Sequence, residues 1–277
     1  MLDVLKPLVL IAGLAYAGFV ALVWLFQPRL VFFPLDAVPA TPASLGLAFE
    51  ELAIESAGGR RISAWYVPAA GAQLTVLHCH GNAGNIGHRL DLLELLHGLG
   101  VNVLLFDYQG YGASQGSPSE ENTQADARAA WDWLARAKAA TPGTIVLHGQ
   151  SLGGAVAARL AAELGPTNRP AGLVLESCFT SLPDLGARLY PFLPVRLIAR
   201  LRYDARDALF RLDCPLLVIH SRADEIVPFE LGQQLFDGYQ GGPKTMLEIT
   251  GDHNMGFLLS RETYVRGWAA FLASLNP

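Results

Sequence analysis

The chain has 277 residues, of which 51% are hydrophobic, and its formal net charge at pH 7 is −5. This length suits one large α/β domain with a short appendage and is enough to bury a sizeable core. The acidic balance provides no basic field for nucleic acid and argues against nucleic-acid binding. The three cysteines are an odd number without framework spacing, so at least one thiol is expected to be free.

The first notable feature is an uncharged stretch over residues 8–26. As a helix it has about the length needed to cross ~30 Å of hydrocarbon, so we predict that residues 1–27 form a single-pass membrane anchor. Ala15-Tyr16-Ala17 also fits the cleavage site of a secretory signal peptide. Because the apolar run continues past that site, an uncleaved signal anchor is favoured.

The residues on either side of this stretch give little information about its orientation. Lys6 lies on one side and Arg29 on the other, so the distribution of positive charge decides the orientation in the membrane only weakly. Four prolines between residues 28 and 42 then indicate an extended linker, 28–48, that is not part of the core.

Residues 49–277 are predicted to form one α/β domain. Segments 49–55 and 61–67 alternate apolar and polar residues around a glycine turn, which is typical of an antiparallel hairpin at a sheet edge. Six further apolar runs alternate with helical segments, and this predicts a mostly parallel, eight-stranded sheet with helices on both faces. The runs are 74–80, 101–107, 144–148, 171–176, 215–220 and 244–249, and the helices are 86–99, 120–139, 152–164, 229–237 and 254–275.

The motif G-x-S-x-G, at Gly149, Ser151 and Gly153, stands between a predicted buried strand and an alanine-rich helical run. A strand that turns abruptly into a helix exposes the serine hydroxyl, and the small glycines let the two arms pass closely. The helix N-terminus offers free N–H groups, and that of Leu152 can face a developing oxyanion. Chance Gly/Ser turns also contain this motif, but the strand before it and the helix after it favour a nucleophile elbow.

A serine hydroxyl needs a base that removes its proton and a third group that orients the base. Asp224 and Glu225 follow the penultimate predicted strand, and His253 follows the last one. We favour His253 as the base and Asp224 as the acid. Glu225 is the neighbouring alternative, and Glu176 and Asp107 are two further carboxylates at strand ends.

Four other histidines lie near strand ends and compete with His253. Two of them are two residues apart and would share a face of their strand, as in a metal pair. No carboxylate or third ligand follows at the spacing of a metal site, so we predict neither a metal nor another cofactor. Structural roles are expected for His78, His80, His148 and His220.

A second oxyanion donor is expected in the loop H-G-N-A-G-N, residues 80–85. Gly81 and Gly84 let the backbone approach a bound carbonyl, so the N–H of Asn82 can complement that of Leu152. An ordinary Gly/Asn turn is the alternative.

Residues 181–213 form an insert that is longer than a plain crossover needs. We predict a small helical cap over the active site, with Phe192 and Leu197 among the residues that bind an apolar acyl chain. The segment also carries six arginines, of which Arg196 and Arg200 share a helix face and could meet anionic headgroups. Alternatively, the apolar residues simply pack on the domain and the arginines form a solvated face.

Together these motifs resemble the α/β-hydrolase superfamily, and within it the single-pass serine hydrolases similar to α/β-hydrolase-domain proteins 13 and 17 and their bacterial relatives. The motifs are H-G-N-A-G-N, F-D-Y-Q-G-Y-G, G-Q-S-L-G-G, S-R-A-D-E-I-V-P and G-D-H-N. The resemblance implies Ser151 as nucleophile, Asp224 as acid, His253 as base, and the N–H groups of Asn82 and Leu152 as oxyanion hole.

The expected function is that of a membrane-anchored serine hydrolase that cleaves esters or thioesters through an acyl-enzyme, with a small-molecule or lipid-like substrate. A serine peptidase and a non-catalytic binding module on the same fold are the alternatives. One departure from the resemblance is Gln109, where such proteins commonly carry arginine.

Overall fold

The computed structural model describes residues 2–275, and the predicted eight-stranded sheet is confirmed. The strand order is β10-β9-β8-β7-β4-β6-β3-β2. β2 and β3 form the expected antiparallel hairpin, β3 pairs antiparallel with β6, and all other neighbours are parallel. The strands are β2 (Glu50–Glu55), β3 (Arg61–Val67), β4 (Thr75–Cys79), β6 (Asn102–Phe106), β7 (Ile145–Gln150), β8 (Gly172–Glu176), β9 (Leu216–Ser221) and β10 (Lys244–Ile249).

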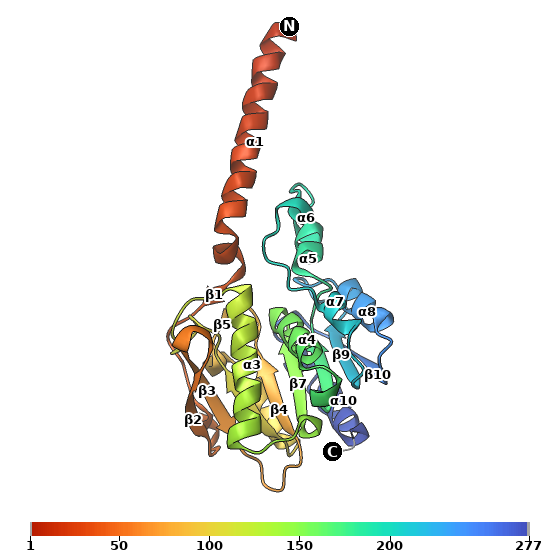
Figure 1. Cartoon of the computed structure of the whole chain (residues 1–277). Coiled ribbons are helices and arrows are strands. Elements are labelled where there is room, and N and C mark those ends of the chain that lie inside the picture. The colour runs from red at the N-terminus through yellow and green to blue at the C-terminus, as the bar shows by residue number, and fades with distance from the viewer. Residues whose placement is uncertain (1, 276–277) are drawn as a thin grey trace.

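Helices cover both faces of this sheet, because the parallel strands are apolar on both sides (Figure 1). One core lies under α3 (Glu120–Ala137), α4 (Leu152–Leu164), α7 (Ala205–Leu209) and α8 (Phe229–Gly238). The other lies under α2 (Leu90–Gly98) and α10 (Arg261–Ser274), with the short α9 (Gly256–Leu259) before α10. The carboxyl ends of β7, β9 and β10 therefore open at one edge of a sheet that is packed on both faces.

Two predicted helices are interrupted in the structure. The segment expected as one helix from residue 254 consists of α9 and α10, which are separated at Ser260. Its hydroxyl accepts a hydrogen bond from the Thr250 N–H at 2.8 Å and donates to the Thr250 carbonyl oxygen at 3.0 Å. The segment expected from residue 86 begins as a short 3₁₀ turn, Ile86–His88, because the Asn85 side chain accepts from the Gly87 N–H and caps that turn.

The N-terminal segment forms one long helix, α1 (Leu2–Val31), which projects away from the domain (Figure 1). Residues Leu5–Val31 are long and apolar enough to cross a membrane, and the helix fits a single-pass anchor. It continues past Pro28, beyond the expected boundary at residue 27.

The segment after α1 differs from the extended linker that the prolines suggested. Phe32 is buried, and β1 (Phe33–Pro34) pairs with β5 (Ala83–Gly84). The Asn85 side chain donates hydrogen bonds of 2.8 Å to the carbonyl oxygens of Leu35 and Ala37. The lower end of α1 is thereby tied to the loop that follows β4.

The predicted cap is smaller than the whole insert. Helices α5 (Leu182–Leu189) and α6 (Val195–Ile198) stand beside the lower half of α1, away from the sheet (Figure 1). In contrast, α7 packs on α4 in the core, and its Ala205, Ala208 and Leu209 are buried. The last part of the insert therefore belongs to the hydrolase core, and we use "cap" below for residues 182–201.

Candidate active site

Ser151 occupies a strained turn between β7 and α4. Its backbone has φ 54° and ψ −121°, a conformation that a residue with a side chain adopts only when its surroundings impose it. Two close backbone approaches impose it here. A Cβ atom on Gly153 would lie 2.0 Å from the carbonyl oxygen of Cys79, and one on Gly149 would lie 2.2 Å from that of Gly153. The two glycines of the motif are therefore steric requirements of the turn.

Replacing Gly153 by alanine is expected to lower the free energy of unfolding by at least ~1–3 kcal/mol, because the neighbouring backbone must move to admit the methyl group. Gly143→Ala is the matched control, since nothing lies within 4 Å of the Cβ it would add. Chemical unfolding of the purified protein in detergent measures both. Equal stability of the two variants would contradict the steric account of the motif.

Asp224 and His253 are in direct contact. The His253 ring places Nδ1 2.8 Å from Oδ2 and 3.0 Å from Oδ1 of the Asp224 carboxylate. The N–H of Val227 also donates to Asp224, at 2.7 Å. Burial alone raises the pKa of Asp224, but hydrogen bonds from His220 and His253 outweigh it and hold the pKa well below its usual range. The carboxylate therefore stays ionised at neutral pH and fixes the tautomer in which Nε2 of His253 is the free acceptor.

The other carboxylates considered from the sequence have different partners. Glu225 accepts the main-chain N–H of His253 at 3.0 Å and does not hydrogen-bond to the ring. Glu176 is buried and accepts from Tyr264 at 2.6 Å and from His148 at 3.1 Å. Asp107 accepts the N–H of a neighbouring loop residue at 2.9 Å. Asp224 is the carboxylate that the fold brings to His253.

Ser151 and His253 line one large cavity of about 930 Å³, which lies over the carboxyl ends of the strands. Within residues 2–275 the Ser151 hydroxyl makes no hydrogen bond with another protein group, and its residue is 8% exposed. Hydrogen bonds between nucleophile and base are often long in unliganded sites and tighten when substrate binds. The cavity is thus the place where a bound carbonyl can meet both groups.

The two expected oxyanion donors line the same cavity. The main-chain N–H groups of Asn82 and Leu152 have no acceptor in the part of the chain that the structure describes. Asn82 is held through its carbonyl oxygen, which accepts hydrogen bonds from the Tyr111 hydroxyl at 2.7 Å and from the Phe33 N–H at 2.9 Å. Its side chain also donates to the carbonyl oxygen of Val31, at 2.7 Å. One of the two donors is therefore positioned by the end of α1.

The four other histidines near strand ends are buried. Nδ1 of His78 lies 3.0 Å from Nδ1 of His148, and burial lowers the pKa of His78 well below its usual value. His80 contacts a carboxylate oxygen of Asp107 at 3.4 Å, and His220 donates to a carbonyl oxygen at 2.9 Å. Among residues 2–275, no group of three or more His, Cys, Asp or Glu side chains is placed to hold a metal ion.

Gln109, the departure noted in the sequence, is hydrogen-bonded to a buried carboxylate. Its side-chain amide donates to Asp126 at 3.0 Å, and its main-chain N–H donates to the same carboxylate at 2.8 Å. Ser56 donates a third hydrogen bond to Asp126, at 2.6 Å. Gln109 thus holds the loop after β6 onto α3 without contacting the cavity.

The two predicted substrate-binding residues differ in position. Phe192 lines the cavity, although it is 61% exposed. Leu197 is 88% exposed and does not line the cavity, whereas Val195 and Ile198 of the single-turn helix α6 do.

The sequence analysis missed the contribution of α1 to the cavity wall. Phe19, Val23 and Leu30 line it together with the cap. The sequence does mark this face of α1, because the polar Gln27 follows the apolar run and lies one turn after Val23.

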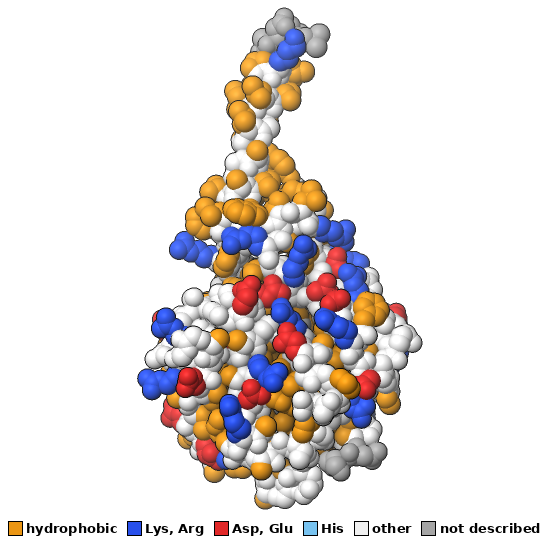
Figure 2. Space-filling view, in the orientation of Figure 1, with side chains coloured by type: hydrophobic (Ala, Val, Ile, Leu, Met, Phe, Trp, Pro, Cys, Tyr) orange, Lys and Arg blue, Asp and Glu red, His pale blue; other side chains and the backbone are white. Residues whose placement is uncertain are grey.

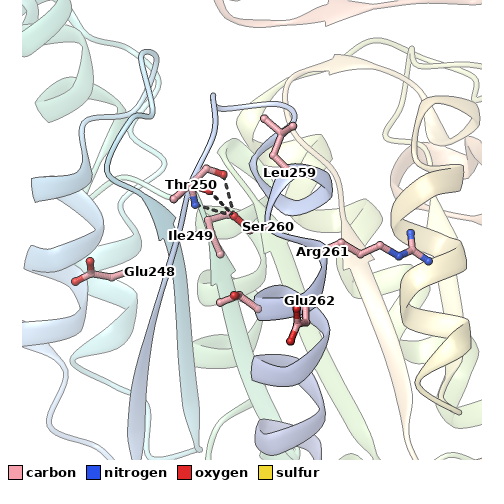
Figure 3. A pocket seen from close by; sticks show the side chains of 8 residues that line it. Glu248, Ile249, Thr250, Leu259, Ser260, Arg261 and Glu262 are labelled. Atoms are coloured by element: carbon pink, nitrogen blue, oxygen red, sulfur yellow. Dashed lines mark hydrogen bonds between the residues drawn. The ribbon is translucent and has the colours of Figure 1, made fainter.

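A second depression, of about 370 Å³, lies between the end of β10 and the start of α10 (Figure 3). Figure 3 shows Ser260 hydrogen-bonded to Thr250 in its centre, with Glu248, Arg261 and Glu262 around it. These hydrogen bonds join the two ends of the loop that carries His253. We assign the depression a structural role in holding that loop.

The order and direction of the strands are those of the α/β-hydrolase fold, and comparisons with known proteins agree. The family model described as "Serine aminopeptidase, S33" matches residues 70–206. An uncharacterized protein of Mycobacterium tuberculosis is 38% identical over 96% of this chain and 94% of its own length. The α/β hydrolase domain-containing protein WAV2 of Arabidopsis thaliana is 35% identical over 96% of this chain and 93% of its own length.

The chain belongs to the α/β-hydrolase superfamily. The mouse lysophosphatidylserine lipase ABHD12 is 34% identical over 62% of this chain, a region that spans 47% of that protein. An esterase structure from Pyrococcus furiosus covers 88% of this chain with a TM-score of 0.72 at 22% identity and shows the shared fold. The narrower resemblance to α/β-hydrolase-domain proteins 13 and 17 stays a prediction.

Proposed function

We propose that the protein is a membrane-anchored serine hydrolase that cleaves carboxylic esters or thioesters of lipid-like molecules through an acyl-enzyme. The observation that carries this proposal is the shared cavity of Ser151 and His253, with Asp224 fixing the ring of His253 from behind. Helix α1 is the proposed anchor, residues 32–48 connect it to the domain, and residues 49–277 form the catalytic domain with the cap inserted in it.

In the proposed mechanism the Ser151 hydroxyl attacks the substrate carbonyl carbon while Nε2 of His253 takes its proton. Asp224 stabilises the imidazolium that forms. The N–H groups of Asn82 and Leu152 bind the oxyanion of the tetrahedral intermediate. His253 then protonates the leaving alcohol or thiol as the acyl-enzyme forms. Water, deprotonated by His253, releases the acid and restores the serine hydroxyl.

The residues that line the cavity favour a substrate with an apolar acyl chain. The lining beyond the catalytic groups is largely apolar and comes mainly from α1, the cap and α9, whereas His88, Arg89 and Asp91 add polar groups near the start of α2. Its volume of about 930 Å³ is at the upper end of the range for small-molecule sites, ~300–1,000 Å³. The similarity to a lysophosphatidylserine lipase favours single-chain lipid esters as the class to test first.

The chain-length dependence of turnover tests this substrate class. We expect kcat/KM for p-nitrophenyl esters to rise from acetyl to octanoyl, by up to about fourfold for each added CH₂ that the cavity buries. Phe192→Ala should flatten this rise, because Phe192 lines the cavity. Leu182→Ala, at another lining position that packs against the hydrophobic core, shows whether any loss of lining volume has the same effect. A steady fall beyond acetyl in the wild type would rule out the acyl-chain cavity. In that case, cleavage of aminoacyl-p-nitroanilides would favour the peptidase alternative.

Retention of the N-terminal anchor is a separate prediction. We expect the mature protein to keep residues 1–27 and to stay in the pellet after carbonate extraction, because the apolar length of α1 is enough to cross a bilayer. Intact mass and the extraction measure these two properties. A mature N-terminus near Gly18, or release into the carbonate wash, would show a cleaved signal peptide or a peripheral protein instead.

A further inference from the structure

The cap is fastened to the side of α1. The Tyr16 hydroxyl donates a hydrogen bond of 2.6 Å to the carbonyl oxygen of Phe192, high on the cap. Lower down, the Gln27 side chain donates to the carbonyl oxygen of Ile198 at 2.6 Å and accepts the N–H of Arg200 at 2.7 Å. These contacts are eleven residues apart on α1, or ~16 Å along the helix axis. The cap therefore runs along the anchor instead of folding down over the sheet.

The active-site cavity extends upward between these two elements. Its base holds Ser151 and His253, and its upper wall includes Phe19 and Val23 of α1 and Phe192 of the cap. Phe19 lies well inside the stretch that is apolar enough to cross a membrane. One continuous apolar cavity thus connects the nucleophile with the level of the proposed bilayer.

The outer surface of the cap is also apolar. Tyr190, Phe192 and Leu197 are exposed on it, and Leu197 is the most exposed of the three at 88%. Figure 2 shows hydrophobic side chains along the stalk and more of them where the stalk widens above the domain. An exposed apolar surface of this kind marks an interaction site. Its position beside the candidate span identifies the bilayer as what covers it.

Charged and aromatic groups mark a lower boundary for that surface. The Arg200 guanidinium lies 4.9 Å from the ring centre of Trp24, and that of Arg29 lies 5.5 Å from the ring centre of Phe26. Figure 2 shows a row of Lys and Arg side chains below the apolar surface. Tryptophan and arginine together are typical of the membrane–water interface. Tyr16 lies eight residues beyond Trp24, so the tip of the cap would reach ~12 Å past the interface.

We propose that the tip of the cap is immersed in the membrane leaflet beside α1, and that a single-chain lipid ester enters the active site from the leaflet through the cavity between α1 and the cap. The route rests on the proposed hydrolase function, whereas the immersion does not. Substrate would then reach Ser151 without leaving the apolar phase, with its headgroup at the level of the arginines.

The immersion is tested without any turnover. Leu197→Cys and Phe210→Cys each place one exposed thiol, because the three native cysteines are buried. Phe210 is 71% exposed and follows α7 on the hydrolase core, which makes it the matched control. A bimane probe on each thiol is compared in phosphatidylcholine vesicles containing lipids with a nitroxide on the acyl chain. We expect strong quenching at position 197 and none at position 210. Equal quenching at both positions, or none at 197, would overturn the immersion.

The route is tested with two substrates. Leu197→Asp puts a charge on the immersed surface without touching the cavity, and Phe210→Asp is the control. For a lysophospholipid embedded in phosphatidylcholine vesicles, we expect Leu197→Asp to lower turnover about tenfold or more, since an aspartate is costly to place in hydrocarbon. Turnover of water-soluble p-nitrophenyl butyrate should stay within roughly twofold of the wild type, which is the scatter of a substitution that leaves the site intact.

The outcomes separate the two proposals. Equal losses with both substrates, or an equal loss in Phe210→Asp, would overturn the route through the leaflet. A wild type that hydrolyses neither ester would overturn the proposed function and with it the route, while the quenching comparison would still decide whether the cap is immersed.

Discussion

Replacing Ser151 by alanine is expected to abolish ester hydrolysis, with a loss in kcat on the order of 10⁴-fold or more, as for other serine nucleophiles that act with a histidine. The reason is its position: among the described residues, Ser151 alone lies in a strained turn directly before α4 and lines the base of the cavity. The variant should fold normally, because the lost hydroxyl makes no hydrogen bond with a protein group in residues 2–275. Initial rates with p-nitrophenyl butyrate measure the effect.

Ser44→Ala is the matched control for this experiment. Ser44 is exposed and lies in the segment before β2, far along the chain from the elbow, where its hydroxyl binds only a neighbouring carbonyl oxygen. It should keep wild-type activity. Retention of more than a few per cent of activity in Ser151→Ala would contradict the assignment of the nucleophile.

The second large effect is expected for Asp224→Asn, which should lower kcat by about 10⁴-fold. An amide cannot stabilise the imidazolium, and its NH₂ group can hold His253 in the wrong tautomer. Glu225→Gln is the adjacent control. An amide oxygen can still accept the main-chain N–H of His253, so this variant should lose less than about tenfold, the scale of a moderate loss of positioning.

Thermal unfolding shows whether Asp224→Asn still folds, because Asp224 is buried and accepts several hydrogen bonds. Equal losses in the two variants would refute the choice of Asp224. A larger loss in Glu176→Gln would move the acid to the end of β8.

The sheet and its helices were predictable because each element carries its own local pattern. The hairpin strands alternate in polarity, and the parallel strands are short apolar runs buried on both faces. Helix α4 has the predicted bounds, since the elbow fixes its start and a glycine ends it at Gly165. The break at Ser260 was not visible, because it depends on hydrogen bonds to Thr250 on another element.

The candidate site was predictable in part for a related reason. The order of strands places the loops of Ser151, Asp224 and His253 at one edge, which follows from topology alone. Choosing between two adjacent carboxylates requires side-chain geometry, and the structure separates Asp224 on the ring of His253 from Glu225 on its main chain. These placements were reached without any knowledge of the substrate.

The cap and the anchor were the least predictable parts. The sequence indicated a helical insert and an apolar helix, but nothing local specifies that Tyr16 and Gln27 bind the cap across more than 170 residues of chain. The face of a one-turn helix is equally hard to predict, because Leu197 and Ile198 are both apolar and only Ile198 lines the cavity. Such long-range contacts follow from packing, not from periodicity.

Covalent labelling tests most directly whether Ser151 is an activated nucleophile. The full chain, in detergent or vesicles, is treated with a fluorophosphonate probe, and the modified residue is located by peptide mass spectrometry. We expect one labelled site, Ser151, with labelling absent in Ser151→Ala and strongly slowed in His253→Ala. Labelling at another serine, or no labelling of a folded wild-type protein, would contradict it.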